Sequence, residues 1–124
     1  MGQLTARRFE EPDEARDLGG MGSLEIVRIG DTVASRATFL PGWRWSEHIR
    51  PIVGGESCQV DHGAFFIVSG RMHVRMDDGT EAGFGPGDIA AIGPGHDAWV
   101  VGDEPVVQLD TSPSSAEYAK PASG

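Results

Sequence analysis

The stretch that decides the fold is CQVDHGAFFIVSGRMHVRMDDGT, residues 58–80. It alternates apolar and polar residues on both sides of a Ser-Gly-Arg corner, which is typical of two consecutive β-strands, because successive strand side chains point to opposite faces. The Asp-Asp-Gly-Thr sequence after the second strand suits a hairpin turn with positive φ. We therefore predict a two-stranded ribbon, on which the other strands of the chain assemble.

The alternation also predicts which side chains of the ribbon point inward. In the first strand one face carries Val60, His62, Ala64, Phe66 and Val68. In the second strand an apolar face carries Met72, Val74 and Met76, and a basic face carries Arg71, His73 and Arg75. We therefore expect His62 to face the interior of the domain and His73 to lie on its surface.

Composition and charge narrow the class of protein. The chain has 124 residues, with 18 glycines and 8 prolines, a net charge of −9 and a single cysteine. A length of this order suits one domain, and a negative charge disfavours nucleic acid and anionic membranes as partners. One cysteine excludes an internal disulfide framework and suits a reducing cytoplasm. Because the sequence has neither an apolar run of about 18 residues nor a secretory signal, we expect no membrane span.

Turn signals divide the chain into short segments. Further strands are predicted at residues 23–29, 32–40, 43–50, 89–92, 96–101 and 106–110. Eight or nine short strands with almost no helix indicate an all-β protein, built as a small antiparallel β-barrel or jelly roll. Residues 1–20 are expected to form an N-terminal arm with room for a helical turn at 12–18, residues 21–111 the barrel, and residues 112–124 a flexible tail.

The segment WRWSEHIR, residues 43–50, leaves two alternatives open. As a strand it would place Arg44, His48 and Arg50 on one face, and Trp43 and Trp45 on the other. Either the tryptophan face belongs to the core and the polar face is solvated, or the polar face lines an internal pocket. In the second case the tryptophan face would pack against another layer or a second subunit.

Two short motifs make residues 37–110 resemble the cupins, a family of small double-stranded β-helix proteins. Gly42 and His48 match the glycine and first histidine of the first cupin motif, and Gly70, after Ile-Val-Ser, matches its closing glycine. Gly87-Asp88 and Gly95 match the second motif. The resemblance implies a barrel that holds a small molecule, often beside a divalent metal ion. It also implies pairing of two copies through their sheets, so we predict a homodimer with Trp43 and Trp45 at the contact.

The sequence departs from the cupin metal motifs at three ligand positions. Arg50, Gly63 and Ala98 stand where the family has histidine, glutamate and histidine. Nearby histidines offer replacements, because His62 adjoins the glutamate position and His96 lies two residues before the last histidine position.

We therefore predict a rearranged site for a divalent zinc, iron, manganese or nickel ion, held by His48, His62 and His96, with Cys58 as a fourth ligand. The alternative for each histidine is a hydrogen-bonded core residue, and for Cys58 a small buried apolar side chain.

Two function classes follow from this reading. In the first, the chain is a metal-dependent enzyme of the dioxygenase, isomerase or lyase type, acting on a small polar or anionic organic molecule. Arg50 and Arg44 would bind its anionic group, and Phe66 and Trp99 would wall the pocket; the catalytic residues stay unknown. In the second, the chain is a non-catalytic cupin, with or without a metal ion, that binds or senses a small molecule.

Overall fold

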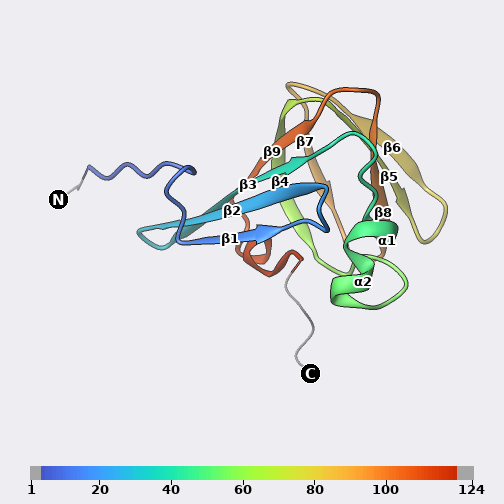
Figure 1. Ribbon diagram of the computed structural model, residues 1–124, viewed down its shortest axis with the longest axis horizontal. Helices are drawn as coiled ribbons and strands as arrows, with labels where there is room; N and C mark the ends of the chain where they lie inside the picture. The colour runs from blue at the N-terminus through green and yellow to red at the C-terminus, as the bar shows by residue number, and fades with distance from the viewer. Residues whose placement is uncertain (1–3, 120–124) are drawn as a thin grey trace.

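The computed structural model of the protein describes residues 4–119. Two antiparallel sheets form its barrel (Figure 1). Their strands are β1 Glu14–Asp17, β2 Gly22–Ile29, β3 Thr32–Phe39, β4 His62–Ser69, β5 Arg71–Met76, β6 Glu81–Phe84, β7 Ile89–Ile92, β8 His96–Val101 and β9 Val106–Asp110. The helices are α1 Trp45–His48, α2 Arg50–Val53 and the 3₁₀ helix η1 Pro113–Glu117. This architecture confirms the predicted all-β antiparallel barrel.

The two sheets have the orders β1-β2-β3-β9-β4-β7 and β6-β5-β8. The central stretch does contain two strands, but the prediction that they pair as a ribbon is wrong. β4 pairs with β7 and β9, whereas β5 pairs with β6 and β8. Gly70 links them with φ 76°, and a Cβ there would lie 2.3 Å from the carbonyl oxygen of Pro105. The corner therefore carries the chain from one sheet to the other, in a conformation that only glycine allows.

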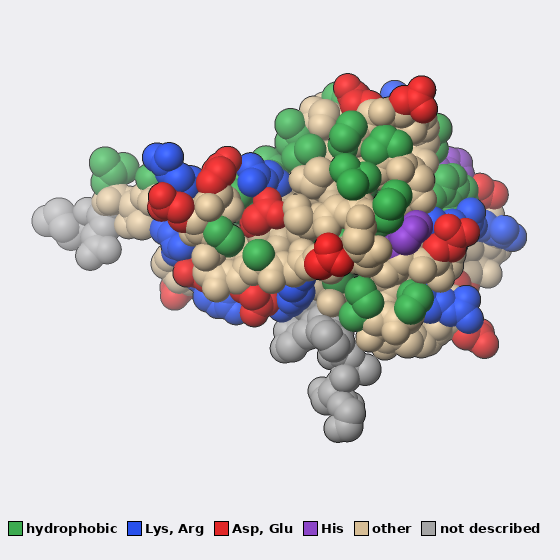
Figure 2. All heavy atoms as spheres, viewed as in Figure 1, with side chains coloured by type: hydrophobic (Ala, Val, Ile, Leu, Met, Phe, Trp, Pro, Cys, Tyr) green, Lys and Arg blue, Asp and Glu red, His purple; other side chains and the backbone are tan. Residues whose placement is uncertain are grey.

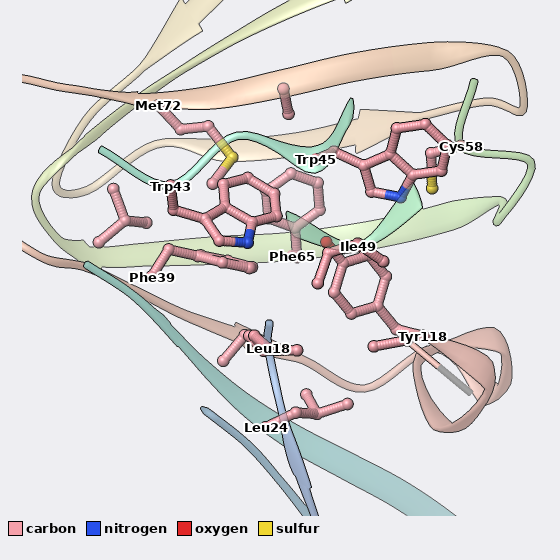
Figure 3. Packing of buried hydrophobic residues seen from close by; sticks show 14 of the residues in the cluster. Leu18, Leu24, Phe39, Trp43, Trp45, Ile49, Cys58, Phe65, Met72 and Tyr118 are labelled. Carbon is pink, nitrogen blue, oxygen red and sulfur yellow. The ribbon is translucent and has the colours of Figure 1, made fainter. Parts of the chain in front are cut away.

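The inner faces of both sheets enclose one hydrophobic core (Figure 3). Phe65 of β4 is 1% exposed, and Trp43 packs on Phe39 of β3 with ring centroids 4.2 Å apart. Met72 and Val74 of β5 are also buried, as the alternation predicts. The core therefore lies between the two layers, where it supports the side chains of the candidate site.

The predicted strand at residues 43–50 is wrong. Only Arg44 makes a strand-like bridge, to Trp99, and the chain then forms α1 and α2. Trp45, Ile49 and Val53 recur every four residues, and this spacing places them on one side of a helical segment. Because Trp43 and Trp45 are each 2% exposed, they belong to the core, and the predicted dimer contact through them is wrong.

A β-bulge changes the predicted faces of β4. The register of β4 against β7 shifts between His62 and Phe65. The extra residue reverses the alternation, so that His62, Phe65 and Ile67 are all buried. Phe66 is consequently 45% exposed on the outer face, and its predicted place in the wall of an internal pocket is wrong.

The segment 14–18 and the C-terminal end of the described chain both pack on the barrel. Residues 14–17 form the edge strand β1 rather than a helical turn, and Leu18 after it is fully buried. The flexible tail predicted from residue 112 is wrong for residues 113–119, because η1 places Tyr118 against Phe39 with ring centroids 6.2 Å apart. The remaining residues of that predicted tail, 120–124, lie outside the described part. No helix within residues 4–119 has the length and apolar character needed to cross a membrane.

Candidate metal centre

Three buried side chains with metal-binding atoms meet inside the barrel. Cys58, His62 and His96 each offer one ligand atom, and these three atoms all lie within 4.8 Å of one another. Their residues are 2%, 7% and 3% exposed. A thiol and two imidazoles brought together away from water form a donor set that suits zinc and other borderline or soft cations.

Backbone pairing aligns Cys58 with His96. The Cys58 amide donates to the carbonyl oxygen of His96 at 2.7 Å, and the His96 amide donates back at 3.2 Å. Residues paired in this way in an antiparallel bridge project their side chains to the same face. Although the two residues are far apart in sequence, this bridge therefore fixes their side chains next to each other.

The ring orientation of His96 leaves one nitrogen available. Its Nδ1 lies 2.9 Å from the carbonyl oxygen of Gly93. A carbonyl can only accept, so Nδ1 carries the proton and Nε2 has a lone pair. A backbone partner of this kind is what commonly orients a histidine that binds a metal.

His62 comes from the bulged start of β4 and faces a small void. Its Nδ1 lies 3.8 Å from Oδ2 of the buried Asp110 and has no hydrogen-bond partner among residues 4–119. Gln108 Oε1 is likewise without a partner within this range, and both residues line a void of about 10 Å³. The void therefore adjoins two residues whose buried polar atoms have no partner in the described part of the chain.

Burial keeps Cys58 and His96 uncharged in the absence of a cation. Desolvation raises the pKa of the Cys58 thiol to about 11. Desolvation is also the main cause that lowers the pKa of His96, and the neighbouring His62 lowers it further. At neutral pH the thiol is therefore protonated and His96 is neutral, so that a cation must displace the thiol proton in order to bind.

His48, the first-motif histidine, does not join this group. It lies at the end of α1, where its Nδ1 accepts a hydrogen bond from the backbone amide of Arg44 at 3.0 Å. The predicted ligand set of four is thus brought together only in part. Helix α1 explains the difference. His48 lies on this helix and not on the strand predicted for residues 43–50, so the strand alternation does not tell where its side chain points.

The predicted substrate-binding residues lie elsewhere. Arg44 pairs with Asp97 at 3.0 Å and stacks over Trp99, with 4.4 Å from its guanidinium carbon to the ring centroid. Trp99 also packs on His73, which confirms that this face of β8 and β5 points away from the core. Arg50 is exposed at the start of α2.

A different set of residues lines the main cavity beside the centre. The cavity measures about 570 Å³ and reaches Cys58. None of Arg44, Arg50, Phe66 and Trp99 is among its walls. The walls are Trp45, Ile49, Val53, Gly54, Gly55, Ser57, Cys58, Gln59, Val60, Asp61, Ser114, Tyr118 and Ala119. Sequence reasoning missed most of these residues, because α1, α2 and η1 were read as a strand, a loop and a tail.

Comparison with known proteins supports the fold. An uncharacterized conserved protein with a double-stranded beta-helix domain from Klebsiella pneumoniae is 25% identical, with a TM-score of 0.54 over 77% of this chain and 79% of that one. The chain has the cupin fold. An oxalate decarboxylase from Lactobacillus farciminis also matches this cupin barrel, at 16% identity and a TM-score of 0.57, over 87% of this chain and 31% of that one.

The other comparisons limit what the likeness shows. AerE from Microcystis aeruginosa matches at 15% identity and a TM-score of 0.58, over 79% of this chain. The cupin chain spans 44% of AerE and 31% of the oxalate decarboxylase, well under the length of either protein. No family model matches the sequence, and no curated protein matches it. The matches therefore establish the architecture, and the chemistry has to be argued from the residues of this chain.

Proposed function

We propose that this chain is a small metal-binding cupin, in which Cys58, His62 and His96 hold one divalent cation. The observation that carries the proposal is the convergence of their three ligand atoms within 4.8 Å in a buried site. Buried polar groups normally have a partner, and His62 Nδ1 has none within residues 4–119. The ring of His62 is thus free to settle with one nitrogen on a cation and the other on Asp110.

The donor set fits zinc best of the four metals considered. In a tetrahedral zinc site with bonds of about 2.0–2.3 Å, two ligand atoms lie about 3.3–3.6 Å apart. The three atoms of this centre lie within 4.8 Å of one another, so side-chain shifts of up to about 1 Å would bring them onto one ion. A thiolate beside two imidazoles favours zinc over manganese, which prefers oxygen ligands.

We infer that the bound ion serves an enzymatic reaction on a small organic molecule. A divalent ion with three protein ligands keeps a position for water or substrate, and acts there as a Lewis acid. The protein's own contribution is the cavity beside Cys58, which lets a molecule approach the centre. Burial of the three ligands excludes bulk water around the reacting group, and the free cysteine suits a reducing cytoplasmic location.

Metal content tests the proposal. Protein produced without a histidine tag should retain near-stoichiometric metal by mass spectrometry, and cobalt substitution should produce a thiolate-to-cobalt charge-transfer band. Cys58→Ser should lose the band, while His48→Gln serves as the matched control and should retain both metal and band. Protein that stays free of metal after reconstitution with zinc, iron, manganese and nickel would refute the proposal. It would leave the metal-free binding module as the function.

The homodimer also stays a proposal, now with a different contact. Apolar side chains gather on the surface over β4, β7 and β9 (Figure 2). Phe66, Val68 and Ile89 are 45%, 53% and 62% exposed, and Phe66 stands directly opposite Ile89 in the sheet. A second copy of the chain is the occupant that we propose for this apolar patch, because pairing through the sheets is what the cupin resemblance implies.

Light scattering of wild type and Phe66→Asp tests the contact. We expect a dimer at micromolar concentration for the wild type and a monomer for the variant, because the introduced charge would be buried without a partner. Trp99→Asp changes an aromatic residue on the other sheet and should leave the dimer intact. A wild-type monomer, or a Phe66→Asp dimer, would rule out this interface.

A further inference from the structure

The cavity beside the candidate centre carries information about the molecule that it accepts. Its volume of about 570 Å³ falls in the usual range for small-molecule sites, about 300–1,000 Å³. Trp45 and Ile49 supply one wall and Tyr118 another, and Figure 3 shows these side chains close together beside Cys58. These residues come from α1, from the turn after it and from the end of η1. The helical segment that starts with α1 and the C-terminal segment therefore build the cavity together.

The buried part of this wall is apolar. Trp45, Ile49, Tyr118 and Ala119 are between 0% and 7% exposed, and Val53 and Val60 are half-buried. A molecule inside the cavity would therefore exchange water for aromatic and aliphatic surface, which favours an apolar body. Trp45 adds an indole N–H, a donor with no acceptor capacity.

Three polar side chains of the wall are already engaged. Ser57 donates to Asp77 at 2.8 Å, and Gln59 donates to Ser57 at 3.0 Å. Ser114 donates to the backbone carbonyl of Asp61. The wall therefore offers little hydrogen bonding that a strongly polar molecule could use without breaking contacts within the protein.

Charge decides the class of molecule. Within the described chain, the residues that line the cavity include no lysine, arginine or histidine. Asp61, exposed at the rim, is the one lining residue with a charge. In the metal-free protein, a carboxylate entering the cavity would lose its hydration without meeting a cation among the described lining residues, and would pass a like charge at the rim.

From these observations we propose that the cavity binds a molecule with a mainly aromatic or aliphatic body, and that in the metal-free protein it favours a neutral molecule over an anion of the same shape. This proposal deepens the proposed function by naming the class of molecule that the same site accepts, and it rests on that function only for the claim that the bound molecule reacts. Arg50 and Arg44, from which an anionic substrate was expected, have no part in this cavity, because neither residue is among those that line it.

A pair of probes with the same shape and different charge tests this inference. We would titrate 2-acetylnaphthalene, a neutral ketone, and 2-naphthoate into chelator-treated, ¹⁵N-labelled full-length protein, and follow amide and indole N–H signals by NMR. The ketone should shift the indole signal of Trp45 and the amides of Gly54 and Gly55. It should bind more tightly than the carboxylate by at least about ten-fold, since the wall offers the carboxylate no cation. Equal or tighter binding of 2-naphthoate would overturn the proposal, as would shifts confined to other parts of the chain.

Two neighbouring positions on α2 provide a matched pair of variants. Val53 lines the cavity, whereas Ile52 beside it does not, and both are half-buried. Val53→Trp should weaken binding of the ketone at least about ten-fold by filling the space, while Ile52→Trp should leave it within about two-fold. Equal effects of the two substitutions would overturn the assignment of the cavity.

Titrations with zinc-loaded and with chelator-treated protein separate this inference from the proposed function. Ketone binding to a protein that holds no metal would sustain the cavity while the metal proposal fails. A protein that binds zinc in the Cys58 centre and does not bind the ketone would sustain the metal centre while the cavity proposal fails.

Discussion

Removal of the Cys58 thiol should change how zinc binding depends on pH. Burial raises the pKa of this thiol to about 11. The thiol is therefore half ionised roughly four pH units above pH 7. Forming the thiolate at pH 7 costs about 5 kcal/mol, at about 1.4 kcal/mol per pH unit. Zinc coordinates the thiolate, so binding must release this proton. We expect the zinc affinity of the wild type to rise about ten-fold per pH unit between about pH 7 and pH 8.

His96 should add nothing to the rise of zinc affinity with pH. Burial lowers the pKa of His96 below its usual value of 6.5, so that it is already neutral throughout this pH range. Cys58→Ser has no titrating thiol, and the proton release assigned to this residue should disappear together with its share of the slope. Cys58 is buried among apolar side chains, and serine keeps its approximate size.

Competition with a fluorescent zinc chelator across this pH range would measure the affinities. Calorimetry in two buffers of different ionisation enthalpy would count the protons released. The expected count is one more proton per zinc for the wild type than for Cys58→Ser. An affinity of the wild type that does not change with pH, or the same proton count for both proteins, would refute a thiolate ligand at this centre.

Three further predictions concern the barrel around the centre. Phe65→Ala should lower the free energy of unfolding by about 3–5 kcal/mol, because the ring is fully buried. Phe66→Ala should change the free energy of unfolding by less than about 1 kcal/mol at concentrations where the protein is monomeric. If urea titrations showed the same loss of stability for both variants, the bulge in β4 would be contradicted. Asp110→Asn should weaken zinc binding about ten-fold by removing the carboxylate that faces His62, and an unchanged affinity in the chelator assay would exclude this role. In metal-free protein the lowered pKa of His96 contributes stability above about pH 6.5 that is lost as the pH falls. The urea midpoint should therefore drop below this pH, less so for His96→Asn, and equal pH profiles would show that His96 does not cause the loss.

Local patterns located the strands better than they located the strand partners. The Ser-Gly-Arg corner at Gly70 was predicted to join two paired strands, but the structure shows there the crossing from one sheet to the other. The strands at residues 89–92, 96–101 and 106–110 were predicted with bounds that the structure reproduces. These segments are short, are bounded by glycine or proline, and are β-branched or apolar, so local signals suffice to identify them.

In two segments the sequence predicted the wrong side chains to point inward. The bulge after His62 cannot be recognised from alternation, because Phe65 and Phe66 are equally apolar and either could face inward. In the segment 43–50, the alternation of tryptophans competes with the four-residue spacing of Trp45 and Ile49. Burial of both in the core decides for the helix.

The sequence by itself determined the all-β class, the positions of most strands, and the presence of histidines and one cysteine in the segments that build the interior. Only the tertiary structure decided which of them meet. Cys58 reaches His96 through a bridge between segments 38 residues apart, and His62 joins them from the opposite sheet. The physical reason is that strand propensity and alternation are local properties, whereas the neighbours of a strand are chosen by the burial of both inner faces in one core.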